Sequence, residues 1–227
     1  MPYTRYERLR AELQPLVRVD THGDPDMGYP VHSVYWDSPG WRFFWEKVEG
    51  LWHRRKLRFR RYGRGDGPVF LEIKQRIGRT VQKRRVRWDP ERVEALFGGG
   101  EPPPVVADGD FADPIAAEIL FLIHRFQLRP RMAVSYRRLA LFGVFEPDLR
   151  ITFDRRLQYE VHDTDILRGF DIGRYILDPR FMVMEIKFND RVPVWLTTLV
   201  RRHELEMVRL SKYCSAVDRE YHGGVLT

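Results

Sequence analysis

The sequence predicts an α+β protein in which an antiparallel β-sheet of about eight strands rolls into a tunnel, with helices on its flanks. Three observations predict this class. Segments with strand character outnumber helical ones, they follow one another in consecutive runs, and several carry Lys or Arg at every second position. Consecutive strand-like runs are typical of an antiparallel sheet rather than of alternating β–α–β units.

The first predicted element is an amphipathic helix over residues 4–14, where apolar residues recur at helical spacing among Arg and Glu. Thr4 and Glu7 have the spacing of an N-terminal capping box. Pro15 is expected to end or kink this helix, because proline lacks the backbone N–H that a helix interior needs.

The remaining elements are predicted from the spacing of apolar residues, which is every second residue in strands and every third or fourth in helices. Turns rich in Gly, Pro, Asn and Asp separate these elements. We expect a loop over residues 98–104 and one domain over 1–227, without a linker long enough to divide it. The predicted strands are 31–37, 56–62, 69–76, 81–88, 131–142, 148–155, 157–162 and 181–188, and the predicted helices are 41–50, 90–97, 114–128 and 193–208.

Composition limits the function classes. The 227 residues carry a formal net charge of +7, which favours an anionic partner such as a phosphorylated molecule, nucleic acid or an anionic membrane surface. No apolar stretch approaches the ~20 residues of a membrane span, so we expect none in this chain. The single cysteine, Cys214, cannot form an internal disulfide, and no apolar leader is visible at the N-terminus. These observations predict a cytoplasmic location and leave the oligomeric state and any membrane partner open.

Cations alternate with apolar residues along the predicted strands. Side chains at i, i+2 and i+4 of a strand share a face, which puts Lys56, Arg58 and Arg60 together. A polar face in water is the ordinary explanation for any one such strand. Recurrence over five or six strands instead favours a cationic tunnel around a linear phosphate chain, because Arg and Lys repel one another unless an anion lies between them. The other groups are Glu72, Lys74 and Arg76; Lys83, Arg85 and Arg87; Tyr136 and Arg138; Arg150, Thr152 and Asp154; and Glu185 and Lys187.

Two strands share the order Glu-Ile-Lys. They are Glu72-Ile73-Lys74 and Glu185-Ile186-Lys187. A carboxylate among cations is either a counter-ion or a metal ligand. Because triphosphates arrive with Mg²⁺ or Mn²⁺, which prefer carboxylate oxygens, Glu185 and Glu72 are the candidate metal ligands.

Taken in order, these segments resemble the VTC domain of polyphosphate polymerases, within the triphosphate tunnel (CYTH-like) enzymes. Each segment is a weak signal, and their order and spacing together carry the resemblance. The matching segments are Ser33-Val34-Tyr35-Trp36-Asp37-Ser38, Lys56-Leu57-Arg58-Phe59-Arg60-Arg61-Tyr62-Gly63, Phe70-Leu71-Glu72-Ile73-Lys74, Lys83-Arg84-Arg85, Tyr136-Arg137-Arg138, Leu149-Arg150-Ile151-Thr152-Phe153-Asp154, Val183-Met184-Glu185-Ile186-Lys187 and Ser211-Lys212-Tyr213.

The resemblance implies a role for each matching position. Glu185 would hold the divalent metal, Lys187 would be a further tunnel cation, and Ser211 with Lys212 would contact phosphate near the reaction centre. The terminal phosphate of ATP would pass to a growing polyphosphate in the tunnel. The residues expected to bind nucleotide or product phosphates are Arg58, Arg60, Lys74, Lys83, Arg138 and Arg150.

The chain departs from the family pattern at its start. Members carry a strand with Glu-x-Lys-Tyr or similar before the first helix, and no such strand precedes Thr4. The first strand of the sheet is therefore expected to be missing, either from the chain given or from the barrel. A barrel without it would have an unpaired edge and would lose one Glu and one Lys of the tunnel.

Three functions remain open at this point: an ATP-dependent polyphosphate polymerase, a tunnel hydrolase of triphosphate or nucleoside triphosphate, and a non-catalytic module that binds polyphosphate or RNA. The absence of an RNP-like aromatic motif disfavours specific nucleic-acid binding. The scattered histidines disfavour a zinc site. The four tryptophans between residues 36 and 52 are interpreted as packing residues, with an adenine platform as the alternative.

Overall fold

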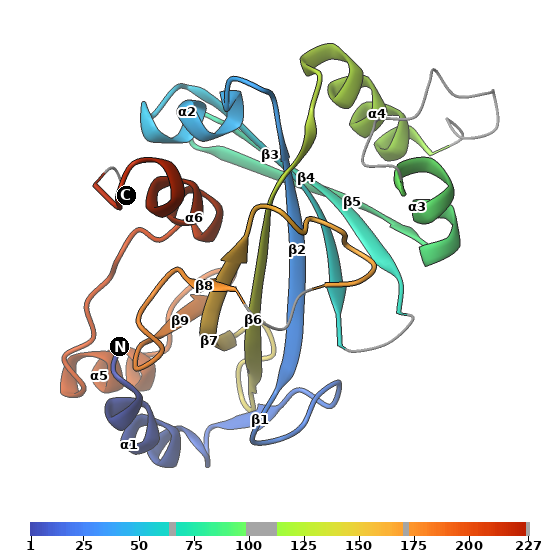
Figure 1. The fold of residues 1–227 in the computed structure, drawn as a ribbon. Coiled ribbons are helices and arrows are strands. Elements are labelled where there is room, and N and C mark those ends of the chain that lie inside the picture. The colour runs from blue at the N-terminus through green and yellow to red at the C-terminus, as the bar shows by residue number, and fades with distance from the viewer. Residues whose placement is uncertain (64–66, 99–112, 170–172, 226–227) are drawn as a thin grey trace. The chain divides into compact units, whose positions relative to one another are not determined.

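The computed structural model describes residues 1–63, 67–98, 113–169 and 173–225 (Figure 1). The predicted 98–104 loop lies outside these residues except for Gly98. The helices of the described part are α1 (Tyr3–Leu13), α2 (Arg42–Val48), α3 (Pro90–Phe97), α4 (Pro114–Phe126), α5 (Val194–Arg202) and α6 (Lys212–Tyr221). Its strands are β1 (Val17–Val19), β2 (Tyr29–Asp37), β3 (His53–Tyr62), β4 (Val69–Ile77), β5 (Thr80–Trp88), β6 (Arg129–Gly143), β7 (Arg150–Glu160), β8 (Arg174–Tyr175) and β9 (Met182–Lys187).

The strands form one antiparallel sheet in the order β5-β4-β3-β2-β6-β7-β8, with β1 paired to β6 and β9 paired to β7. The predicted antiparallel sheet with flanking helices is therefore confirmed. Within the described residues the path does not return from β8 to β5, so the sheet is open, and its closure into a tunnel stays a prediction.

Contacts along the chain divide it into two compact units, which we describe separately. The first unit comprises Met1–Pro30, Tyr136–Leu157 and Leu177–Leu210, and the second comprises Val31–Ser135, Gln158–Ile176 and Ser211–Thr227. We predicted a single domain over residues 1–227. The division into two compact units does not test that prediction, so it stays a prediction.

In the second unit, the alternation of strands β2–β5 separates an apolar face from a charged one. Leu57 and Phe59 of β3 lie opposite Ile73 and Leu71 of β4, and all four are buried in one core. The amphipathic helices α3 and α4 place their apolar residues in the same core, and Figure 1 shows both helices beside these strands. The face of the sheet covered by α3 and α4 is therefore the apolar one, which leaves the charged residues of β3–β5 on the other face.

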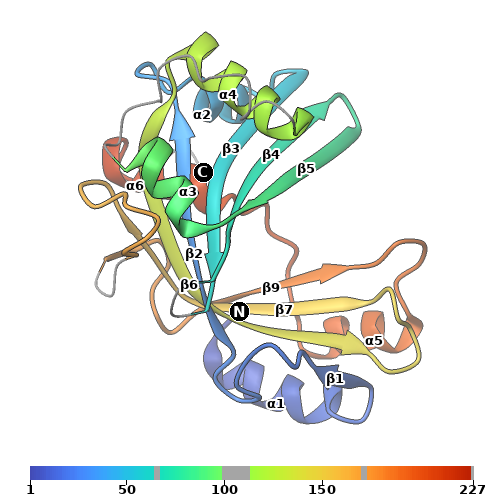
Figure 2. The same cartoon turned by 90° about the vertical axis from the view of Figure 1, so that its right-hand side faces the viewer.

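In the first unit, α1 and α5 pack on the strands β7 and β9 through a second core (Figure 2). The predicted capping box at Thr4 is wrong: α1 begins after Pro2, which makes no side-chain cap. The segment before α1 is extended, because Pro2 forms a β-bridge with Phe181 and Met1 donates from its amino group to the Met182 carbonyl at 2.7 Å.

Several elements differ from those predicted. The two strands expected at 148–155 and 157–162 are one strand, β7, which continues through Arg156 at φ 51°. The helix expected over 193–208 ends at Arg202, because Glu204 adopts a left-handed φ of 47°. The short strands β1 and β8 and the helix α6 were not predicted.

Candidate functional site

The predicted cations of β3–β5 share one face of the sheet in the second unit. Residues directly opposite each other in antiparallel strands point to the same side. Lys56 lies opposite Lys74, which lies opposite Lys83, and Arg58 lies opposite Glu72, which lies opposite Arg85. The grouping predicted from alternation is therefore confirmed for these strands. We call this set the cationic face: Lys56, Arg58, Arg60, Lys74, Lys83, Arg85, Arg87 and Glu72.

Glu72 is the one carboxylate of the cationic face among the described residues. Its side chain is 2% exposed, and it accepts a hydrogen bond from Arg58 Nε at 2.6 Å and lies 2.8 Å from Lys83 Nζ. Burial opposes its ionisation, but the charges of Arg58, Arg60 and Lys83 lower the pKa of Glu72 to about 2. Both carboxylate oxygens therefore serve as partners for cations, and the assignment of Glu72 to a metal stays a prediction.

Replacing Glu72 by Gln is expected to make the free energy of unfolding depend less on pH between pH 2 and pH 4.5. The folded pKa of about 2 lies below the ordinary 4.5, so the stabilisation is complete above pH 4.5 and is lost as the pH falls towards 2. The shift corresponds to about 3 kcal/mol. Urea unfolding between pH 2 and pH 7 measures it.

The control for this experiment is Asp178→Asn. Asp178 also has a pKa of about 2, set by Arg180, but the pair is exposed and solvent screens it. If both variants changed the pH dependence of the free energy of unfolding equally, the buried ion pairs of Glu72 would not be the origin of the stabilisation.

Lys74 lies between two other lysines across the sheet, and like charges placed opposite each other repel. We expect Lys74→Gln to leave the free energy of unfolding unchanged or raise it by about 0.5 kcal/mol. The predicted phosphate role of Lys74 can be tested with polyphosphate as a probe: the same change should weaken its binding and reduce the slope of log affinity against log salt by about 1. Calorimetric titration at several salt concentrations measures both.

Arg79→Gln is the matched control for Lys74→Gln, because Arg79 is exposed in the turn between β4 and β5. Replacement of Arg58 is less informative, since it also removes the partner of Glu72. Equal affinity losses in the Lys74 and Arg79 variants would mean that binding depends on net charge and not on the cationic face.

The N-terminus of α6 joins the cationic face through Ser211. Lys56 Nζ donates to Ser211 Oγ at 2.6 Å, and the same oxygen accepts from the Cys214 backbone N–H at 3.2 Å. Ser211 is thus the N-cap of α6, and Lys212 is the first residue of this helix. The structure therefore brings the predicted residue Ser211 to Lys56 at the end of the row of lysines, and Lys212 follows it in the chain.

A buried hydrogen-bond network around Asp37 holds α6 in place. No functional role was predicted for Asp37 from the sequence. Asp37, at the end of β2, is fully buried and accepts from the backbone N–H groups of Ser38, Phe43 and Phe44 at 2.7 to 3.0 Å. Tyr213 Oη donates to the same carboxylate at 2.5 Å. Burial, and secondly the charge of Asp37, raise the pKa of Tyr213 well above its usual value, so the hydroxyl remains a donor. One carboxylate therefore ties together β2, α2 and α6.

Two residues of β2 face the same side as the arginines of β3. Arg60 Nε donates to Ser33 Oγ at 2.9 Å, and Arg58 Nη1 lies 3.3 Å from Tyr35 Oη. Burial opposes ionisation of Tyr35, yet the charges of Arg58, Arg60 and Lys56 lower its pKa to about 8. The cations of this face therefore stabilise negative charge enough to outweigh the burial of the phenol.

The other predicted site residues lie in the first unit. Arg138 is 8% exposed and forms a bidentate pair with the fully buried Asp154, at 2.7 and 2.8 Å. Glu185 Oε2 lies 3.8 Å from Arg138, and its other oxygen lies 3.2 Å from Lys187 Nζ. Opposite Lys187 in the ladder is Arg150, which lies 3.7 Å from Asp20 and 3.4 Å from Tyr29 Oη. Arg138, Glu185 and Lys187 therefore form one charged group.

Glu185 suits the metal of a phosphate complex better than Glu72 does. Its side chain is 42% exposed, so its oxygens can be reached from solvent. Within the described ranges, no group of three or more His, Cys, Asp or Glu side chains is arranged to hold a metal ion. A single carboxylate is nevertheless sufficient for Mg²⁺ or Mn²⁺ when phosphate oxygens and water supply the other ligands, so the donor set fits a metal that arrives with the nucleotide.

Comparison with known proteins places this geometry in a family. The chain matches the VTC domain over residues 1–221. It belongs to the VTC domain family. The match covers both units, and it includes every residue of the cationic face and of the charged group around Glu185.

Two curated relatives of this VTC domain are the vacuolar transporter chaperone complex subunit 4 of Trypanosoma brucei brucei (strain 927/4 GUTat10.1) and that of Trypanosoma cruzi (strain CL Brener). Both are 25% identical to it, over 230 and 229 residues respectively, and each alignment covers 86% of this chain. The aligned part is 29% of the first relative and 28% of the second, so the chain spans less than a third of their length. Of the helices in the described ranges, none combines the length and apolar character needed to cross a bilayer.

Proposed function

We propose that this VTC domain is a polyphosphate polymerase that transfers the terminal phosphate of ATP to a growing polyphosphate chain. The observation that carries the proposal is the cationic face. The Lys and Arg side chains of the cationic face project from one side of β3–β5, and Glu72 is the single carboxylate among them. Like charges in such a row repel one another, and the oxygens of a bound phosphate chain would relieve this repulsion through charge-assisted hydrogen bonds.

In the proposed reaction, an oxygen at the end of the polyphosphate attacks the terminal phosphorus of ATP. The bond from this phosphorus to the bridging oxygen breaks, and ADP leaves with that oxygen. Phosphoryl transfer needs alignment and charge stabilisation more than covalent chemistry from the protein. Lys212 and Ser211, at the N-terminus of α6, are proposed to contact the transferred group, because the positive end of the helix adds to the lysine charge.

Each unit carries its own set of proposed phosphate contacts. Arg58, Arg60, Lys74 and Lys83 of the second unit would bind phosphates along the cationic face. Arg138, Arg150 and Lys187 of the first unit would bind phosphates near Glu185. A divalent metal at Glu185 would neutralise charge on the phosphate oxygens bound there. The family membership supports the proposal in general, because the matched range contains both sets of residues.

The decisive experiment incubates the purified protein with ATP and either Mn²⁺ or Mg²⁺ and separates polymer from free phosphate by gel and by phosphate assay. Polymer that lengthens with time, with one ADP formed for each phosphate added, is the expected result. Free phosphate without polymer would instead identify a tunnel hydrolase. Salt-dependent polyphosphate binding without consumption of ATP would identify a binding module.

Glu185→Gln is expected to raise the metal concentration needed for half-maximal ATP turnover by about 10-fold or more, because an amide is a weaker ligand than a carboxylate. The measurement is a Mn²⁺ titration at fixed ATP. Asp178→Asn, a carboxylate change at an exposed pair elsewhere in the first unit, is the control. The metal role would be wrong if both variants kept the wild-type titration.

A further inference from the structure

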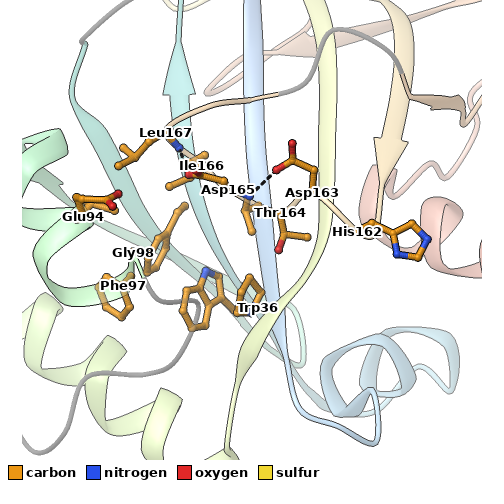
Figure 3. Close-up of a pocket in the computed structure, with 14 residues that line it drawn as sticks. Trp36, Glu94, Phe97, Gly98, His162, Asp163, Thr164, Asp165, Ile166 and Leu167 are labelled. Carbon is orange, nitrogen blue, oxygen red and sulfur yellow. Dashed lines mark hydrogen bonds between the residues drawn. The ribbon is translucent and has the colours of Figure 1, made fainter.

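A pocket of about 300 Å³ lies in the second unit, on the apolar side of the sheet (Figure 3). Its floor includes Val34, Trp36 and Phe59. These residues alternate along β2 and β3 with the residues that face the phosphate side, so pocket and cationic face lie on opposite sides of the same strands. A ligand in this pocket would therefore not be the polyphosphate of the proposed reaction.

The pocket holds a buried donor that lacks an acceptor. Trp36 is 3% exposed, and no described residue accepts a hydrogen bond from its Nε1. Figure 3 shows the ring nitrogen on the side of the indole that faces the segment 162–167, across the pocket. Buried polar groups in proteins are nearly always paired, so an acceptor inside the pocket is expected to complete this one.

Aromatic rings form one wall of the pocket. The ring centroids of Trp36 and Phe59 are 4.8 Å apart, and Phe97 of α3 lies 5.3 Å from Trp36 and 5.0 Å from Phe59. The faces of aromatic rings carry partial negative charge and attract ammonium groups.

The rim of the pocket is acidic, in a chain with a formal charge of +7. Glu94, Asp163 and Asp165 line it, and none of its 14 lining residues is Lys or Arg. Asp165 has a partial partner in the exposed Arg168, at 3.5 Å. The rim segment is held in place by Arg61, which donates to the carbonyls of Ile166 and Leu167. Asp163 and Asp165 are thus on a segment held by Arg61, Glu94 is on α3, and the three carboxylates favour a cation.

We propose that this pocket binds a small organic ammonium compound. Its apolar body would lie against the three rings, and an oxygen of the ligand would accept from Trp36 Nε1. The acidic rim, with Glu94 and Asp163 on opposite sides of the pocket, would attract its ammonium group. The site is independent of the cationic face and does not rest on the proposed polymerase activity.

The test uses three probes of similar shape and the ¹⁵N-labelled protein. Tyramine has both the ammonium group and an oxygen acceptor, phenethylamine lacks the oxygen, and 3-(4-hydroxyphenyl)propionate reverses the charge. We expect tyramine to shift the Trp36 indole N–H resonance, phenethylamine to bind about 10-fold more weakly, and the propionate not to bind. Trp36→Phe assigns the resonance.

Two surface variants keep the test decisive if Trp36→Phe does not fold. Glu94→Gln and Asp163→Asn are rim changes, and together they are expected to weaken tyramine binding about 10-fold, whereas Arg79→Gln leaves it unchanged. The proposal is overturned if tyramine and the propionate bind equally, or if the rim variants bind tyramine like the wild type. It is also overturned if the indole N–H contacts only a water molecule and no probe shifts it.

Discussion

Replacing Arg138 by Met is expected to lower the free energy of unfolding by about 3–5 kcal/mol. The change removes both hydrogen bonds from Arg138 to Asp154 and leaves that fully buried carboxylate without its bidentate partner. An uncompensated charge in the interior costs far more than an exposed ion pair gains. Urea unfolding at pH 7, followed by circular dichroism, measures the loss.

Two comparisons separate this explanation from a general loss of packing. The double variant Arg138→Met with Asp154→Leu removes the stranded charge and is expected to recover most of the stability. Arg150→Met removes a neighbouring arginine whose closest carboxylate is 3.7 Å away, and it should cost about 1 kcal/mol or less. If the double variant were no more stable than Arg138→Met alone, the stranded charge would not be the cause.

This pair also bears on how much of the site the sequence could predict. Alternation correctly placed Arg138, Asp154 and Glu185 at positions facing one way along their strands. It could not predict that Asp154 is the partner of Arg138, because the choice depends on which residues of two distant strands come opposite each other. Arg138 was therefore interpreted only as a phosphate ligand, although two of its nitrogens already bind Asp154.

The sheet was predictable because its strands are long and strongly alternating. Charged and apolar residues alternate in the central parts of β3 and β4, and the pairing of β3, β4 and β5 confirms the predicted sharing of one face by their cations. Elements that depend on one backbone angle were not predictable. Arg156 and Glu204 adopt left-handed conformations that are unusual outside glycine, the first within β7 and the second just after the end of α5.

The missed helix α6 carried a signal that could have been used. Ser211 is a preferred N-cap residue, and buried positions follow it at helical spacing in Tyr213, Cys214 and Val217. Residues 211–214 were interpreted only as part of the family motif, so the helical spacing of the residues after Ser211 was not used. The consequence is functional, since the cap serine of α6 is also the oxygen that meets Lys56 of the cationic face.

Asp37→Asn is expected to destabilise the protein by about 3 kcal/mol and to reduce any activity that depends on Ser211 and Lys212. The amide removes the carboxylate charge, and one of its two ends presents N–H donors to groups that are themselves donors. The anchor of Tyr213 on β2 is then lost, and α6 with its first residues is free to shift. Unfolding in urea and ATP turnover measure the two effects.

Tyr213→Phe is the matched variant, because it removes one of the four donors to Asp37 and keeps the ring stacked on Tyr35 at 4.8 Å. We expect it to cost about 1.5 kcal/mol, since three backbone N–H groups still bind the carboxylate. The effects of the two changes should not add in the double variant, because both remove the same contact. Full additivity would mean that Asp37 and Tyr213 stabilise the fold independently and that the carboxylate does not position α6.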